Sequence, residues 1–248
     1  VLERRRPWED EELSRATLTE DIPLVIALSL LNRRLSLHQL KEDCPFLSAG
    51  AGPDEIEALY EGAMLKLECE PDRWQEAPEV VVVELRRAME HGFEEAELKF
   101  MRLNILRSLD ESVEREATQS SRAWASRLME AIDSEEVPMD AATIRSLIAP
   151  AIEAVDVEIC REALIEFWGE GDQVVYGVGT LALGESGEAQ LEQALAEAWS
   201  APLEAAEALS EVAFAYASDP GDAGEIVRHE HVEDRDLHPY EFAPGLRP

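Results

Sequence analysis

The sequence predicts an α+β fold in which helices pack on a sheet. Apolar residues recur at helical spacing over several long windows, and shorter segments rich in β-branched or small residues lie between them. Hydrophobic residues make up 46% of the 248 positions, an ordinary fraction for a globular protein that buries a core. The order helix, strand, strand, long helices, strand, helix indicates a layer of helices on a sheet.

The first predicted elements are a helix and a strand. Ile22 to Leu40 reads as a well-buried helix because leucines recur at steps of four, three and four, at Leu24, Leu28, Leu31 and Leu35. Pro45 ends any helix before the small residues Ser48 to Gly52, which let another backbone approach closely. Partial alternation from Ala58 to Cys69 predicts a strand between two prolines. These prolines are Pro53 and Pro71.

The window around Val80 to Val83 carries two conflicting signals. Four consecutive valines favour a strand by local propensity. Over a wider window, apolar residues fall on one helical face, and Gly92 stands where a left-handed helix cap belongs. The apolar residues of this face are Val81, Leu85, Ala88 and Met89. We therefore predict a helix that ends at Gly92.

A long amphipathic helix is predicted next. Apolar residues step by three and then by four from Leu98 to Val113. The helix is expected to break or bend in the serine-rich patch Gln119 to Ser121. It then resumes through an apolar line formed by Trp124, Leu128 and Ile132.

Two aspartates predict the starts of two further helices. Asp140 is a good N-cap for a helix that runs to about Val155. Asp156 repeats the signal and opens a helix that closes at Gly169. Two lines of apolar residues run along this second helix: Ile159, Ala163 and Phe167, and beside them Cys160, Leu164 and Trp168.

The last part of the domain is predicted as a strand and a helix. Val174 to Leu183 is β-branched, aromatic and glycine-containing, which favours a strand. Ser186 is expected to cap a helix with Leu191, Leu195 and Trp199 facing inward. After Pro202 the chain becomes charged and rich in proline and glycine, as in a connector. We therefore expect an acidic lead-in at 1–21, an α+β domain at 22–200 and a connector at 201–248.

The charge balance and the cysteines exclude several classes of function. Against 22 Lys and Arg stand 54 Asp and Glu, a formal charge of −32, which repels nucleic-acid backbones and anionic membrane surfaces. Cys44, Cys69 and Cys160 are scattered, so they predict buried structural thiols rather than disulfides or a zinc knot. The sequence contains no apolar run of 18 residues, so no membrane-spanning helix is predicted. We expect a soluble protein, cytoplasmic or periplasmic/secreted, and the sequence does not decide the compartment.

Three segments resemble a known enzyme family. They are LLNRRL at Leu30–Leu35, PFLSAGAG at Pro45–Gly52 and ELRRAMEHGFEEAEL at Glu84–Leu98. In this order they are similar to the inner, non-catalytic domain of the pitrilysin/insulinase zinc peptidases. The resemblance extends over about Ile22 to Arg247, where the end looks like the linker into a third domain. One departure is Glu94, a weak N-cap where the family often has threonine or serine, although Glu97 still suits a capping box.

The resemblance implies a fold and a role. The fold would be a two-layer domain of helices on a mostly antiparallel sheet, and residues 1–21 would be the truncated start of that domain. The role would be to pack against a catalytic zinc domain of the same polypeptide and to line a chamber for peptide substrate. The family's zinc motif, HxxEH, does not occur in this sequence, so the zinc is expected in the catalytic domain outside it.

The residues themselves indicate no catalytic, cofactor-binding or metal site. His229, His231 and Glu233 would share one face of a strand, with His238 nearby, but their spacing matches no zinc-hydrolase motif, and an exposed linker strand is the simpler interpretation. GESG at Gly184–Gly187 is not a GxSxG elbow. His38 is ordinary, His91 suits a helix C-terminus, and Cys44 lacks a catalytic partner.

Four arginines are conspicuous in so acidic a chain. They occur as two pairs, Arg33–Arg34 and Arg86–Arg87. On helix faces they are expected to pair with local carboxylates, while a role in substrate binding stays unassigned. The alternative to a peptidase domain is a stand-alone acidic interaction domain or an inactive peptidase-like subunit, because a fold does not establish an activity.

Overall fold

The computed structural model describes residues 1–9, 14, 17–56, 59–133, 137–169, 171–181, 183–203, 226–229 and 240–242. It divides the chain into two units, Val1–Ala208 and Leu209–Pro248. The first unit contains a sheet with helices packed on it, so the predicted α+β fold class is confirmed. Within the described part of the chain, no helix is long and apolar enough to cross a membrane.

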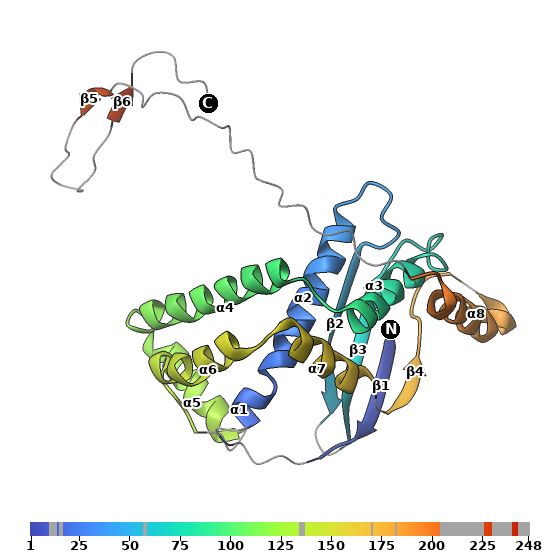
Figure 1. Cartoon of the computed structure of the whole chain (residues 1–248), viewed down its shortest axis with the longest axis horizontal. Coiled ribbons are helices and arrows are strands. Elements are labelled where there is room, and N and C mark those ends of the chain that lie inside the picture. The colour runs from blue at the N-terminus through green and yellow to red at the C-terminus, as the bar shows by residue number, and fades with distance from the viewer. Residues whose placement is uncertain are drawn as a thin grey trace. The chain divides into compact units, whose positions relative to one another are not determined.

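The sheet of the first unit has four strands in the order β2-β3-β1-β4, and all neighbours are antiparallel. The strands are β1 (Leu2–Pro7), β2 (Ser48–Ile56), β3 (Tyr60–Glu68) and β4 (Asp172–Val175). β2 and β3 form a hairpin, while β1 lies between β3 and β4 (Figure 1). The first and last strands described in this unit therefore lie side by side in the sheet.

No strand was predicted within residues 1–21, the expected acidic lead-in and start of the domain, but β1 lies there. The strand reads LERRRP, with one apolar residue among charged ones, so neither propensity nor apolar alternation marks it. It forms because both of its edges find partners, with Leu2 opposite Leu65 on one side and opposite Val175 on the other. Backbone hydrogen bonds to strands on both sides hold β1 in the sheet, and such bonds leave no apolar pattern in the sequence.

The helices form a layer on the sheet and an outer group. α2 (Ile22–Gln39), α3 (Ala77–His91) and α7 (Val157–Gly169) contact the sheet strands. Figure 1 shows the outer group, in green and yellow, extending to one side of them. The outer group comprises α4 (Glu95–Glu116), α5 (Ser121–Asp133) and α6 (Ala141–Ala154), while α8 (Gly187–Ser200) packs on α3 and the short α1 (Thr17–Glu20) precedes α2.

The core lies between the sheet and α2, α3 and α7. Most of its fully buried side chains come from the apolar faces that predicted the helices. They include Ile26, Leu30, Leu31, Leu35, Val81, Leu85, Leu98 and Leu164. On α7 the line of Cys160, Leu164 and Trp168 faces the core, whereas Ile159 of the other line is 39% exposed.

The predicted helix boundaries are largely confirmed. The valine run lies inside α3, and Gly92 ends that helix with φ of 72°. The break near residue 120 separates α4 from α5, and Asp140 caps α6 by accepting a hydrogen bond from the Thr143 amide at 2.6 Å. Asp156 likewise accepts from the Ile159 amide at 2.8 Å.

Three details differ from the prediction. Pro53 lies inside β2 instead of bounding the next strand, which is possible because β2 is an edge strand that needs fewer donors. β4 ends at Val175, before Gly177 and Gly179, which are poor strand formers. Ser186 precedes α8, but its side chain makes no capping hydrogen bond and instead accepts one from Gln190 at 2.7 Å.

The second unit contains a hairpin. β5 (Ile226–His229) pairs antiparallel with β6 (Tyr240–Phe242). His229 therefore lies on a strand, as predicted. The other members of that cluster, His231, Glu233 and His238, fall outside the described residues.

Candidate functional site

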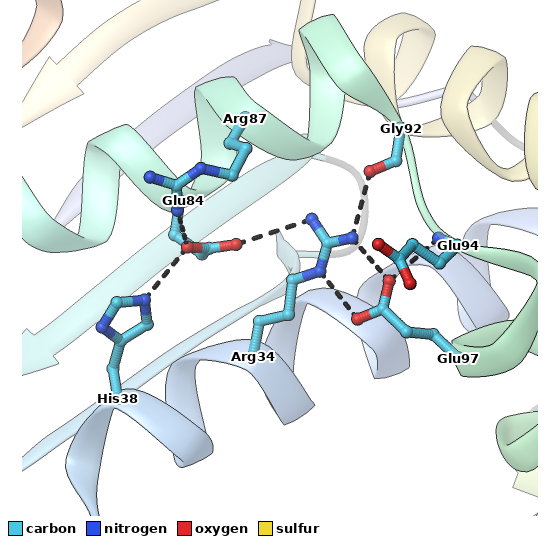
Figure 2. A network of polar contacts seen from close by, with 7 residues as sticks. All are labelled: Arg34, His38, Glu84, Arg87, Gly92, Glu94 and Glu97. Atoms are coloured by element: carbon cyan, nitrogen blue, oxygen red, sulfur yellow. Dashed lines mark hydrogen bonds and ion pairs between the residues drawn. The ribbon is translucent and has the colours of Figure 1, made fainter. Parts of the chain in front are cut away.

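A buried polar junction joins α2, α3 and α4, and Arg34 is at its centre (Figure 2). The Arg34 Nε donates to Glu97 Oε1 at 2.9 Å, and Nη2 donates to Glu97 Oε2 at 2.5 Å. Nη2 also donates to the Gly92 carbonyl at 3.2 Å. The Arg34 guanidinium thus holds one carboxylate with two parallel bonds, the strongest geometry available to an ion pair.

Glu84 is the second carboxylate of the junction. Its Oε1 lies 3.5 Å from Arg34 Nη1, and its Oε2 accepts from Arg87 and lies 3.1 Å from His38 Nε2. Glu84 is 2% exposed and Arg34 is 8% exposed, so these charges are withdrawn from water. Burial of charges is tolerated only when each has a partner, and here two arginines face two carboxylates.

Glu97 also closes the turn between α3 and α4. Its Oε2 accepts a hydrogen bond from the backbone amide of Glu94, the N-cap of α4, at 3.0 Å. This is the part of a capping box that the sequence predicted for Glu97. Because Arg34 also binds the Gly92 carbonyl, the end of α3 and the start of α4 are both tied to α2.

Asn32 links the same helix to the sheet. Its Nδ2 donates to the Ala51 carbonyl at 2.8 Å, and its Oδ1 accepts from the Ala51 amide at 2.7 Å. One side-chain amide therefore takes the place of a neighbouring strand at this point of the β2 edge. An occupied edge is less available for unwanted pairing with another chain.

The three segments that carry the family resemblance meet at this junction. LLNRRL supplies Asn32 and Arg34, the small-residue strand supplies Ala51, and the third segment supplies Glu84, Gly92 and Glu97. Of the four arginines, only Arg87 pairs with a local carboxylate as predicted, and the partners of Arg34 are distant in sequence. Arg33 stacks over Phe100 at 4.3 Å, and Arg86 donates to the carbonyls of Ala198 at 3.4 Å and Ala201 at 2.8 Å.

Charge partners set the ionisation of Glu84. Burial alone would raise the pKa of this carboxyl, but the hydrogen bond with His38 and the charges of Arg87 and Arg34 outweigh it and lower the pKa below 4.5. A lowered folded-state pKa stabilises the fold above the unfolded value. That contribution is lost as the pH falls through the folded value.

The substitution Glu84→Gln is therefore expected to destabilise the domain near neutral pH and to matter progressively less in acid. Urea unfolding of wild type and variant at a series of pH values measures this difference. Glu111→Gln is the matched control, because Glu111 pairs with Arg107 on an exposed helix face and should change stability little. A destabilisation by Glu84→Gln that stays constant down to the lowest pH would contradict the assigned role.

The described residues offer no candidate metal centre. They contain no group of three or more His, Cys, Asp or Glu side chains able to hold a metal ion. Burial raises the pKa of the Cys160 thiol to about 12, and Cys44 and Cys69 are half-buried. His91 lies in the last turn of α3, as predicted. The junction is thus a site of structural chemistry, in which Glu84 and Glu97 already bind arginine.

The chain resembles known proteins in structure but not in sequence. No family model matches the chain, and no curated protein matches it by sequence. Solved structures do match. The first half of the periplasmic protease PqqL from Escherichia coli has a TM-score of 0.67 at 18% identity, over 83% of this chain and 45% of that one.

Two other proteases give similar likenesses. A predicted insulinase family protease from Yersinia pestis has a TM-score of 0.61 at 13% identity, over 78% of this chain and 43% of that one. The ferredoxin protease FusC, in complex with Arabidopsis ferredoxin, has a TM-score of 0.60 at 13% identity, over 98% of this chain and 27% of that one. The chain spans less than half the length of each, and at these identities the likenesses show the fold.

Proposed function

From the pitrilysin/insulinase-like fold of this chain, we propose that it is the non-catalytic second domain of a zinc metalloendopeptidase, with the linker towards a third domain. The observation that carries the proposal is the extent of the match: 83% of this chain corresponds to 45% of one half of a protease. That share is what one domain of a two-domain half would occupy. Peptide hydrolysis, and the zinc for it, would then belong to a catalytic domain outside this chain.

In this role the polar junction would fix the shape of the domain. A domain that borders a catalytic chamber has to hold its sheet at a set position, because small misplacements of a reacting geometry are costly. Arg34 ties three helices together, and Asn32 ties α2 to the sheet. These contacts support a rigid scaffold and require no contribution to bond cleavage.

The sheet face opposite the helices would be the side that meets peptide. Side chains alternate across a strand, so Glu3 and Arg5 point away from the face that carries Leu2 and Leu65. Arg5 Nη2 lies 2.5 Å from Glu3 Oε2, and its guanidinium stacks over Tyr60 at 4.3 Å. The Tyr60 hydroxyl donates to Asp54 at 2.7 Å. Although Glu3 is only 1% exposed, its charge is paired with Arg5, so this face supports a polar wall rather than a second apolar core.

The purified chain is expected not to cleave unstructured peptides, with or without added zinc. The reason is that its histidines lack the spacing of a zinc-hydrolase motif. The measurement is mass spectrometry of a peptide mixture after incubation with the chain. A chelator-sensitive turnover that disappears in the double variant His229→Ala and His231→Ala would contradict the proposal and would assign a catalytic metal to the linker.

A further inference from the structure

Among the described strands, none lies beside the outer edge of β4. Among the described residues it pairs only with β1, in an order that places it at the end of the sheet. Val1 and Tyr176 exchange two backbone hydrogen bonds, of 2.9 and 3.1 Å. Because hydrogen-bonded and non-bonded pairs alternate in an antiparallel ladder, Gln173 and Val175 direct their N–H and C=O groups away from β1. These four groups lie on the free edge.

A groove lies against this same edge. A cavity of about 380 Å³ is lined by Gln173 and Val175 on one side and by α8 on the other. The α8 residues are Glu188, Leu191, Glu192, Leu195, Ala196 and Trp199. A second cavity of about 790 Å³ shares Val175, Leu191 and Leu195 with the first, so the space continues towards the end of β3. The residues that carry the free backbone groups are therefore the residues that line the groove.

We propose that the groove between β4 and α8 binds an extended polypeptide segment, which adds to the sheet as a strand beside β4. The segment would gain backbone hydrogen bonds to Gln173 and Val175. Its alternate side chains would rest on Leu191, Leu195 and Trp199, so apolar residues fit at every second position.

Charge identifies the occupant as basic. Glu188 and Glu192 are exposed at the groove and lie one helical turn apart, which favours lysine or arginine between the apolar positions. Lys66 and Glu68, which line the second cavity, form an ion pair with each other at 3.4 Å and add no net charge there. A second copy of this chain is a poorer fit, because each copy carries a formal charge of −32.

The other edge of the sheet differs in a way that supports this choice. At β2 the Ala51 backbone already has both bonds to Asn32, whereas nothing described fills the corresponding positions of β4. Strand addition beside β4 does not require proteolysis by the parent protein. Failure of the binding test would therefore leave the proposed function untouched.

The test uses the full chain and a fluorescein-labelled peptide that alternates valine with lysine, measured by fluorescence anisotropy. We expect saturable binding. The same peptide with alternate backbone amides methylated should not bind, because it cannot donate to a strand edge, and a valine–glutamate peptide should not bind because of its charge. Equal binding of the methylated peptide, or no binding of the valine–lysine peptide, would overturn the proposal.

Two variants localise the binding. Gln173→Pro removes an outward N–H group without disturbing the pairing of β4 with β1. The double variant Glu188→Lys and Glu192→Lys reverses the charge at the groove. Each variant should weaken peptide binding by about tenfold or more. Glu162→Lys with Glu166→Lys is the matched control, an equal charge change at exposed positions of α7. An equal loss of binding in the control would exclude this groove as the peptide site. A dimer that sedimentation detects without peptide, and that Gln173→Pro dissociates, would make a second copy of the chain the occupant and would overturn the proposal.

Discussion

Replacing Arg34 by methionine is expected to lower the free energy of unfolding by about 3–5 kcal/mol, the range typical of breaking a buried ion pair. Methionine keeps much of the side-chain volume but removes both bonds to Glu97 and the bond to the Gly92 carbonyl. Glu97, which is 3% exposed, then keeps a buried charge without its arginine. The measurement is urea unfolding at neutral pH, followed by circular dichroism.

Two further variants separate charge from packing. Arg107→Met is the control, because Arg107 pairs with Glu111 at an exposed helix position, and it should change stability by less than about 1 kcal/mol. In the double variant Arg34→Met and Glu97→Met, no unpaired charge remains at this site, so part of the loss should be recovered. A double variant no more stable than Arg34→Met would show that lost packing, rather than an unpaired carboxylate, causes the effect.

Replacing Gly62 by alanine is expected to destabilise the domain by about 3 kcal/mol or more, enough to prevent folding if the margin is small. A Cβ at this position of β3 would overlap the carbonyl of Arg4 in β1 and lie 3.2 Å from the Arg5 Cα. These obstacles are backbone atoms, so no side-chain rotation relieves them. β1 would have to move away from β3, and its pairing with β4 would suffer as well.

Gly52→Ala provides the matched control for this prediction. Gly52 lies on the neighbouring strand β2, and a Cβ there would meet nothing within 4 Å. This variant should keep wild-type stability within about 0.5 kcal/mol. Thermal melting of both variants tests the contrast, and a Gly62→Ala protein that melts with the Gly52→Ala protein would refute the close approach of β1 and β3.

The helices could be predicted from the sequence because their signals are local. The apolar face of α3 and the cap at Gly92 lie within one window, and they outweigh four valines. β1 could not be predicted in this way. Its partners in β3 and β4 lie far along the chain, and half of its own residues are arginine.

In the candidate site, too, pairs of residues close in sequence could be predicted, and pairs far apart in sequence could not. The sequence predicted local pairing for the arginines, and Arg87 does pair with Glu84 three positions away. The partner of Arg34 is 63 residues away, and no periodicity relates the two positions. The resemblance had marked both segments, although it could not say that they touch.

The proposal that this chain is one domain of a zinc metalloendopeptidase is tested most directly by the coding sequence upstream of the codon for Val1. We expect an open reading frame that continues in frame through a preceding domain with an HxxEH motif and a later glutamate. A preceding domain without HxxEH, or a reading frame that begins at this chain, would contradict the proposal and would favour an inactive subunit or a stand-alone acidic interaction domain.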